Sequence, residues 1–255
     1  MHGTTIRLRR IFPPERPRIF AVPLDHAVSM GPIEGLESTS AVAEELERSG
    51  VNLLIVPKGA VRDVAPTLRP TTLLAVHLSA STTLGETPDL KVLTGTPTEA
   101  VGLGADLVSV QVNFGIPGEG EMLRDLGIAV DQCRALGLPL LVMAYVKRPG
   151  GGSSEEIRHA CRASADLGAD IVKTSYPGSF DELVRLIRST PVPVLLGGGE
   201  KNGSEDELLD RVREVVRAGG RGICIGRNLF QRRPVGPLAQ RISTILADRS
   251  DPRAP

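Results

Sequence analysis

Short apolar runs recur along the chain, and each ends in polar or turn-forming residues. The run at 19–24 (IFAVPL) ends at Asp25 and His26, and the run at 51–56 (VNLLIV) ends at a proline followed by Lys58. Runs of this length and composition are typical of buried β-strands. The pattern predicts eight strands, which cover residues 19–24, 51–56, 73–76, 107–112, 138–144, 169–173, 192–196 and 221–225.

Between these runs apolar residues recur at helical spacing, and most of the intervening stretches end at a glycine. A glycine just after a helix can adopt the left-handed conformation that turns the chain into the next strand. Ser153 with Glu156, and Ser204 with Glu207, have the spacing of capping boxes, which begin helices. The predicted helices cover residues 39–49, 96–103, 121–136, 153–167, 181–189, 206–218 and 237–248.

Strands that alternate with helices predict parallel βα units. Eight such units in 255 residues predict an α/β fold, a single-domain (β/α)8 TIM barrel. LGADLV at 103–108 recurs as LGADIV at 167–172, as a repeated unit would. We expect an N-terminal arm at 1–18, the barrel at 19–248 and a C-terminal tail at 249–255. The alternative is a doubly wound open sheet, whose phosphate-binding glycines follow the first strand; here glycines cluster after the last two.

Composition and charge argue against several classes of protein. The formal net charge is zero and the pI is about 6.9, whereas a nucleic-acid-binding protein carries a basic surplus. The chain has no apolar run of membrane-spanning length and no hydrophobic signal region near its N-terminus. The three cysteines lack metal-binding spacing. We therefore expect a cytoplasmic protein with neither a nucleic-acid nor a membrane partner.

The carboxyl ends of the strands of a TIM barrel meet at one rim, where active sites lie. Polar residues and glycines follow most of the predicted strands. The predicted rim residues are Asp25, His26, Lys58, His77, Asn113, Tyr145, Lys173, Gly198, Gly199, Lys201, Gly226 and Arg227. This gathering predicts an active site at the rim.

Lys173 ends the sixth predicted strand. Burial disfavours an ammonium group, so we expect a lowered pKa and an amine that attacks carbonyl groups. Only five of the 30 Lys and Arg residues are lysines, and a group that must lose its proton cannot be arginine. The lysines are therefore candidates for chemistry. The alternative is a lysine that reaches from the strand end into solvent.

Glycines follow the seventh and eighth predicted strands, where many barrels bind phosphate. These are 197–199 and Gly226, the latter followed by Arg227. Their backbone N–H groups could approach phosphate oxygens, and a short helix beginning at Asn228 would add its positive end. Lys201 could add a charge. The alternative is that these glycines only form tight turns.

The other rim residues suggest proton transfer rather than metal binding. A zinc site needs about three ligands, and of the four histidines only His26 and His77 fall at the rim, so no metal is expected. Asp25 is predicted as a charge partner or proton shuttle for Lys173, and Tyr145 as a proton donor or acceptor. His26 could equally be structural, and Tyr145 could be a packing residue.

Several motifs occur together in this chain. They are LDHAVSMGPIEGLE at 24–37, HLS at 77–79, the two LGAD repeats, ADIVKTSYPG at 169–178, GGGEKN at 197–202 and GRNLFQ at 226–231. In these motifs the chain resembles the archaeal-type class I fructose-bisphosphate aldolase family over nearly its whole length. Within that family it is most similar to the branch of the 2-amino-3,7-dideoxy-D-threo-hept-6-ulosonate synthases and the actinobacterial aldolases that make aminohydroxybenzoate precursors.

The resemblance implies that Lys173 forms a Schiff base, with Asp25 as the strand-one acid, Tyr145 as the acid/base group and the glycine segments as a phosphate cradle. It implies no cofactor and a ring-shaped homo-oligomer, often a decamer. The implied reaction joins a phosphorylated ketose donor (dihydroxyacetone phosphate or a deoxy-ketohexose phosphate) to an aldehyde such as aspartate semialdehyde. The product would be a 2-amino-heptulosonate-type precursor of an aminohydroxybenzoate or aromatic compound.

Two rim segments depart from the family pattern. Tyr-Pro-Arg-Gly is common where this chain has Tyr145 followed by Val146 and Lys147, and His-Lys-Gly is common where it has Pro57 and Lys58. Other activities therefore stay open. These are a fructose-bisphosphate aldolase, a phosphosugar isomerase or epimerase with a cationic lysine and an aspartate base, and a phosphate-binding sensor without catalysis.

Overall fold

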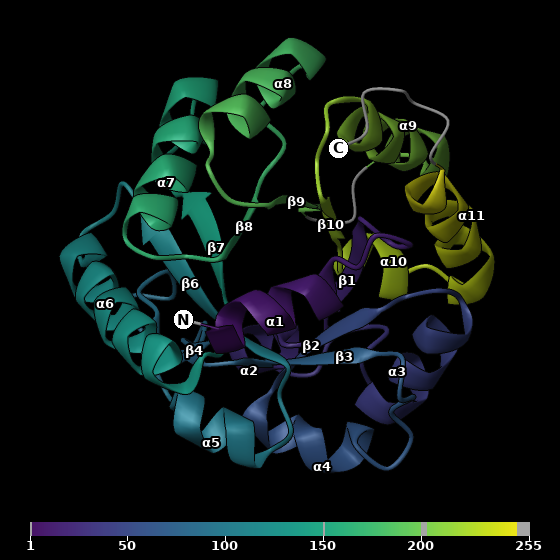
Figure 1. Cartoon of the computed structure of the whole chain (residues 1–255), viewed down its shortest axis with the longest axis horizontal. Coiled ribbons are helices and arrows are strands. Elements are labelled where there is room, and N and C mark those ends of the chain that lie inside the picture. The colour runs from purple at the N-terminus through teal and green to yellow at the C-terminus, as the bar shows by residue number, and fades with distance from the viewer. Residues whose placement is uncertain (1, 150, 200–202, 249–255) are drawn as a thin grey trace.

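The computed structural model describes residues 2–149, 151–199 and 203–248, and its central feature is a closed barrel of eight parallel strands (Figure 1). The strands are β1 (Ile19–Pro23), β2 (Leu53–Pro57), β3 (Leu73–His77), β6 (Leu107–Phe114), β7 (Leu140–Val146), β8 (Ile171–Thr174), β9 (Val194–Gly197) and β10 (Gly222–Cys224). Their order around the ring is β1-β10-β9-β8-β7-β6-β3-β2. The pairing of β1 with β10 closes the ring, which confirms the predicted (β/α)8 barrel.

Helices surround the barrel and cover the outer faces of the strands (Figure 1). They are α3 (Thr39–Arg48), α4 (Val61–Val64), α5 (Pro97–Gly102), α6 (Glu119–Leu136), α7 (Ser154–Asp166), α8 (Phe180–Ser189), α9 (Glu205–Arg217) and α11 (Val235–Ala247). Both predicted capping boxes are formed, at the beginnings of α7 and α9. These helix starts were therefore correctly predicted from local residues alone.

Successive strand residues point to opposite faces of the sheet, so the strands contribute side chains to two apolar cores. One set packs outward against the helices, with Phe20, Val22 and Leu54 as examples. The other set fills the barrel interior and comprises Ile19, Ala21, Leu53, Ile55, Ala75, Leu107, Leu141, Met143, Ile171, Leu195 and Cys224, together with Ile11. Burial on both faces explains why the strands read as nearly continuous apolar runs.

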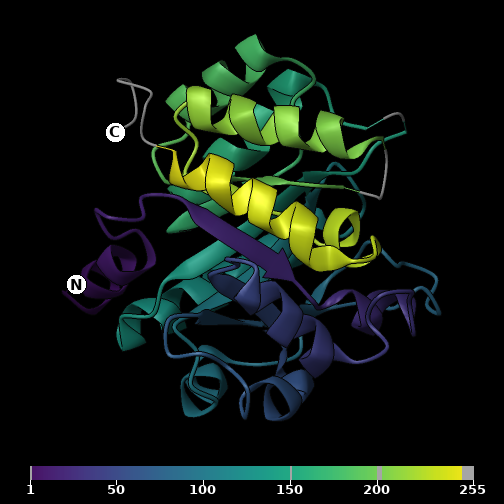
Figure 2. The same ribbon diagram turned by 90° about the vertical axis from the view of Figure 1, so that its right-hand side faces the viewer.

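The predicted N-terminal arm begins with a helix, α1 (His2–Ile11), which the sequence analysis did not predict. Ile11 is fully buried in the inner core with Ile19 and Leu107, the first residues of their strands. Arg7 Nη1 donates to the Gly137 carbonyl at 2.7 Å, in the turn before β7. Figure 2 shows α1 beside the beginning of β1. Helix α1 therefore closes the end of the barrel opposite the predicted active site.

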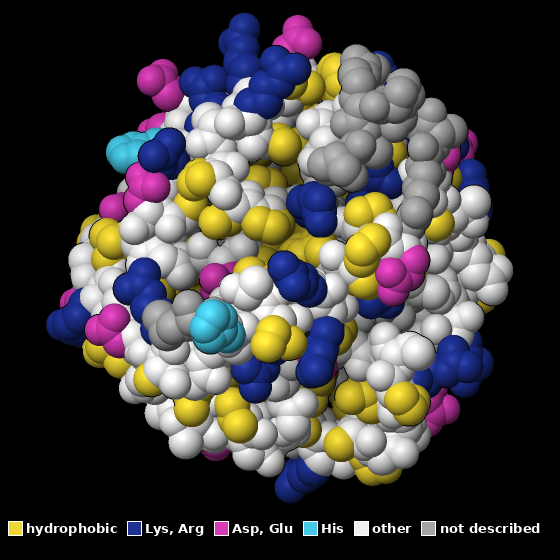
Figure 3. Space-filling view, viewed as in Figure 1, with side chains coloured by type: hydrophobic (Ala, Val, Ile, Leu, Met, Phe, Trp, Pro, Cys, Tyr) yellow, Lys and Arg dark blue, Asp and Glu magenta, His cyan; other side chains and the backbone are white. Residues whose placement is uncertain are grey.

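The face that carries α1 shows basic side chains gathered around its centre, with acidic side chains mostly toward the edge (Figure 3). The last turn of α1 contributes Arg9 and Arg10. Within the described ranges, no helix combines the length and apolarity needed to cross a membrane. The predicted tail at 249–255 lies outside the described residues.

Several short elements lie at the other end of the barrel. They are α2 (His26–Met30), η1 (Lys58–Ala60), the hairpin strands β4 (Ser79–Ala80) and β5 (Val92–Leu93), and α10 (Arg227–Phe230). The short helix predicted near Asn228 corresponds to α10. The β4–β5 hairpin was not predicted, because strands of two residues are too short to show a period.

Candidate active site

A cavity of about 600 Å³ opens at the carboxyl ends of the barrel strands. Its lining includes Asp25, His26, Ser29, His77, Asp89, Lys91, Gln111, Met143, Tyr145, Lys147, Lys173, Gly198, Gly199, Cys224, Gly226 and Arg227. The two-residue alternation of side chains along a strand explains why some of these residues face the cavity. Lys173, Tyr145 and His77 each lie two residues beyond an inner-core residue and therefore extend the inward-facing rows to the mouth.

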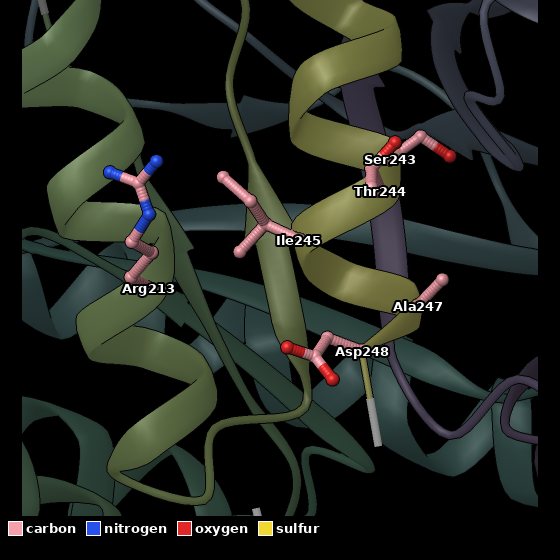
Figure 4. A pocket seen from close by; sticks show the side chains of 6 residues that line it. All are labelled: Arg213, Ser243, Thr244, Ile245, Ala247 and Asp248. Carbon is pink, nitrogen blue, oxygen red and sulfur yellow. The ribbon is translucent and has the colours of Figure 1, made fainter. Parts of the chain in front are cut away.

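A second hollow, of about 660 Å³, lies on the outside of the barrel between α9 and α11 (Figure 4). Its charged side chains are Arg213 and Asp248, and Arg213 already pairs with Asp210 at 2.6 Å. The barrel mouth, by contrast, brings a buried lysine, a carboxylate, two imidazoles and a phenol to one cavity. The mouth is therefore the candidate active site.

Lys173 is the deepest cation of this cavity. Its residue is only 5% exposed, and its Nζ lies 3.7 Å from Met143 Sδ and 5.8 Å from the centroid of the Tyr145 ring. The side chain therefore does not reach into solvent, which was the alternative considered from the sequence. A lysine amine held in a cavity of this size can meet a substrate carbonyl.

The prediction that the pKa of Lys173 is lowered was wrong, because its pKa is raised. Burial does lower the pKa of Lys173, but the acidic groups of Cys224, Tyr145 and Asp25 raise it by more, so the net direction is upward. Burial also raises the pKa of the Cys224 thiol, which is therefore protonated near neutral pH. Asp25 is thus the anion that holds the Lys173 ammonium at neutral pH, and the amine must lose a proton before it can attack.

Asp25 is buried between two histidines. Its Oδ1 lies 3.5 Å from His26 Nδ1 and its Oδ2 lies 3.6 Å from His77 Nε2. Burial raises the pKa of Asp25, but His77, His26 and Lys173 lower it by more, so Asp25 is ionised. Burial lowers the pKa of His26 to about 4 and also lowers that of His77. Both imidazoles are therefore neutral near pH 7, and His77 Nδ1 lies 2.8 Å from Ser109 Oγ.

Tyr145 and Lys173 meet at Gly197, the last residue of β9. A Cβ built on Gly197 would lie 3.5 Å from both Tyr145 Oη and Lys173 Cε. The phenol and the lysine stem therefore approach the same backbone position. Tyr145 is thus placed to exchange a proton with a molecule bound to Lys173.

The glycines after β9 and β10 are tightly packed. A Cβ on Gly198 would lie 2.8 Å from Ile225 Cγ2, and one on Gly226 would lie 2.6 Å from His26 Cε1. Asn228 Nδ2 donates to the Gly198 carbonyl at 2.8 Å, which ties the two glycine segments together. The structure thus brings the predicted glycines and Arg227 to the cavity wall, while Lys201 lies outside the described residues.

Lys58 is a predicted site residue that the structure does not bring to the cavity. It begins η1, is half exposed and pairs with Glu99 at 3.2 Å. The chain turns outward at Pro57, so the end of this strand does not place its lysine at the mouth.

Asn113, which was predicted at the rim, is buried behind the cavity wall, and its Nδ2 donates to the Asp89 carbonyl at 2.6 Å.

The sequence analysis missed two cavity residues, Gln111 and Lys91, as members of the site. Gln111 could have been found by the strand period, because it lies two residues beyond the inward Ser109. Lys91 could not, because the unpredicted β4–β5 hairpin places it. Among the described residues, no group of three or more His, Cys, Asp or Glu is arranged to hold a metal ion.

Comparison with known proteins gives a consistent picture. A family model described as DeoC/LacD family aldolase matches residues 19–232. A 2-amino-4,5-dihydroxy-6-oxo-7-(phosphonooxy)heptanoate synthase of Streptomyces griseus is 35% identical, with 98% of this chain and 94% of the relative covered. A 2-amino-3,7-dideoxy-D-threo-hept-6-ulosonate synthase of Halobacterium salinarum is also 35% identical, over 99% of this chain and 94% of the relative.

Solved structures agree with the curated relatives. An archaeal fructose 1,6-bisphosphate aldolase superimposes with a TM-score of 0.85 at 26% identity, covering 96% of this chain and 99% of the other. Another solved structure, of an archaeal fructose-1,6-bisphosphate aldolase with its catalytic lysine covalently bound to the carbinolamine intermediate of the substrate, also gives a TM-score of 0.85 at 26% identity, covering 96% of this chain and 100% of the other. The resemblance that the sequence motifs indicated is confirmed.

Proposed function

Because the chain belongs to the DeoC/LacD family of aldolases, we propose that it joins a phosphorylated ketose donor to an aldehyde through an imine on Lys173. The observation that carries this proposal is the buried Lys173 Nζ in a cavity that also holds Asp25 and Tyr145. The solved aldolase with a carbinolamine on its catalytic lysine supports the same chemistry.

The first step is imine formation. The donor phosphate binds the backbone N–H groups of Gly198, Gly199 and Gly226 and the Arg227 guanidinium, which places the ketone beside Lys173. The Lys173 ammonium gives up a proton to solvent at the open mouth, and the amine attacks the ketone carbon to form a carbinolamine. The carbinolamine hydroxyl takes a proton back from solvent and leaves as water, and an iminium remains.

The second step makes the carbon–carbon bond. The iminium withdraws electrons, so the adjacent carbon loses a proton to solvent, or loses a carbon substituent that leaves as an aldehyde and releases its hydroxyl proton, and an enamine forms. The enamine carbon attacks the acceptor aldehyde carbon, the iminium forms again, and the new alkoxide takes a proton from the Tyr145 phenol. The Tyr145 phenolate then takes up the proton that enamine formation released. Water adds to the iminium and gives a proton to solvent, and the carbinolamine collapses to the product ketone and the free Lys173 amine. Asp25 stays anionic throughout these steps and stabilises the positive charge of the iminium on Lys173.

For the acceptor we propose aspartate semialdehyde, which would give a 2-amino-heptulosonate-type product. The names of the Streptomyces and Halobacterium relatives support this choice, because both describe a seven-carbon carboxylic acid with an amino group at carbon 2. A fructose-bisphosphate aldolase activity is the second candidate, and the solved archaeal aldolases favour it. By family resemblance we also propose a ring-shaped homo-oligomer, which light scattering would test.

Product mass tests the proposed function against its alternatives. The purified protein would be incubated with dihydroxyacetone phosphate, or a deoxy-ketohexose phosphate, and with aspartate semialdehyde or glyceraldehyde 3-phosphate. We expect a new species that contains a carbon–carbon bond between donor and aspartate semialdehyde. A product that is only an isomer of the donor would instead indicate an isomerase, and binding without any product would indicate a phosphate sensor.

A further inference from the structure

The cavity has a second charged wall opposite the glycine segments. In the ring, β3 lies four places from β9, and β6 lies four places from β10. The connection between β3 and β6 therefore stands across the mouth from the predicted phosphate cradle. This connection carries Asp89 and Lys91, and both residues line the cavity. Lys173 on β8 lies between the two walls in the ring order.

Lys91 is the buried cation of this wall. It is only 9% exposed, and its Nζ donates to the hydroxyls of Ser29, at 3.1 Å, and Ser81. In the described part of the chain, no carboxylate oxygen lies within 4.0 Å of this Nζ. Asp25 and Asp89 act on it from farther away and favour its charge, but burial outweighs them and lowers the pKa of Lys91. An ammonium has three N–H donors, and two of them are used by hydroxyl groups. A carboxylate of a bound molecule could accept the third and would offset the cost of burying the charge.

Asp89 and Lys147 complete the wall as an ion pair. Their charged atoms lie 3.0 Å apart, and both residues line the cavity. The backbone fixes both ends, because Asn113 Nδ2 donates to the Asp89 carbonyl and the Lys147 N–H donates to Phe114 O at 2.9 Å. The pair offers one negative and one positive group side by side. An α-ammonium and its carboxylate would match these two groups.

The charge of the wall favours a carboxylate over a phosphate. Lys91 and Lys147 contribute two positive charges and Asp89 one negative charge, so the sum is one positive charge. A phosphate dianion bound here would face the Asp89 carboxylate, which is unfavourable. A carboxylate monoanion beside an ammonium group meets a complementary charge at each position.

We propose that Lys91, with the Asp89–Lys147 pair, is the acceptor-binding site and selects aldehydes that carry an α-amino acid group. The proposal rests on the proposed aldolase function, since it assumes that Lys173 holds the donor between this wall and the glycine cradle. The aldehyde carbon would then face Lys173 while the charged end of the acceptor contacts Lys91. These residues determine specificity and take no part in the covalent steps.

The test compares Lys91→Met with Arg62→Met, which removes an exposed cation on α4 outside the cavity. The readout is the KM for aspartate semialdehyde and the kcat/KM for glycolaldehyde, which has no charge. Loss of a hydrogen bond to a charged group predicts an increase in KM for aspartate semialdehyde of about 10- to 100-fold in Lys91→Met. The glycolaldehyde value should fall by much less than the KM for aspartate semialdehyde rises, and Arg62→Met should match the wild type with both aldehydes.

A second variant separates the two ends of the acceptor. Asp89→Asn should raise the KM for aspartate semialdehyde but not that for succinate semialdehyde, which lacks the ammonium group. This variant also tests the proposal if Lys91→Met does not fold. Equal losses with charged and uncharged aldehydes, or a preference of the wild type for glyceraldehyde 3-phosphate, would overturn the proposal.

Failure of the proposed function would give a different result. A wild-type protein that forms no borohydride-trapped adduct with the donor would refute the imine mechanism. A wild-type protein that forms the adduct, while Lys91→Met and Asp89→Asn leave every acceptor KM unchanged, would refute only the acceptor site.

Discussion

The charge of one lysine depends on residues far away in the sequence. Lys173 ends a buried strand, and burial alone would lower its pKa. The barrel places Cys224, Tyr145 and Asp25, at the ends of three other strands, within electrostatic reach of the same Nζ, and together they raise the pKa of Lys173. The sequence identified Lys173, Tyr145 and Asp25 as rim residues, but the sign of the shift depends on their distances and on burial, which only the fold supplies.

Asp25→Asn should move imine formation to lower pH. The variant removes the anion that holds the Lys173 proton at neutral pH, so the pKa of Lys173 falls and a larger fraction is free amine at each pH. The measurement is the rate of borohydride trapping with donor across neutral and alkaline pH. Asp63→Asn, which removes an exposed carboxylate on α4, serves as the control. A midpoint that stays in place or moves to higher pH would show that Asp25 does not hold this proton.

Tyr145→Phe should slow turnover much more than it slows imine formation. The phenol lies at the same backbone position as the lysine stem, and loss of a positioned general acid or base costs about 10²- to 10⁴-fold in rate. The rate of product formation and the yield of trapped adduct would be measured on one sample. Near-normal turnover would remove Tyr145 from the mechanism, whereas loss of the adduct would assign it to the dehydration step.

At the scale of elements, local residues predicted most of the helices and strands. Ser153 and Ser204 marked two helix starts through their capping boxes, and glycines marked the turns into strands. The helix within the arm at 1–18 was not predicted, because the face of α1 that carries Ile11 is buried only once the barrel forms. Lys58 lies outside the cavity for a related reason: its strand end was correctly located, but the direction of the following turn was not encoded locally.

Helix α1 should contribute to stability through Ile11. Ile11 is fully buried in the inner core, whereas Ile6 on the same helix is 50% exposed. Ile11→Ala is expected to lower the free energy of unfolding by about 2–5 kcal/mol, and Ile6→Ala by much less. Denaturant titration of both variants gives the comparison. Equal effects at the two positions would mean that α1 does not close the barrel in solution.

At the scale of the whole molecule, eight similar βα units predicted the barrel, and the barrel predicted where the active site lies. The fold collects strand ends from the entire chain into one cavity, so Asp25, His26, His77, Tyr145, Lys173 and the glycine segments meet there. The wall formed by Asp89, Lys91 and Lys147 was not predicted, because it depends on a connection with almost no regular structure.

Catalysis should survive exhaustive chelation. In the proposed mechanism the iminium on Lys173 withdraws electrons from the reacting carbon, which is the role a divalent metal would otherwise fill. Activity would be measured after dialysis against EDTA and after addition of zinc. Activity that is lost on chelation and restored by zinc would place the enzyme in the metal-dependent class of aldolases.

The covalent bond to Lys173 is the central claim. The wild-type protein would be treated with borohydride in the presence of dihydroxyacetone phosphate and then digested, and its peptides would be weighed by mass spectrometry. We predict the added mass of the reduced donor on the peptide that contains Lys173, and no added mass in Lys173→Arg, because arginine cannot supply a free amine. An adduct on a different lysine, or full turnover by Lys173→Arg, would contradict it.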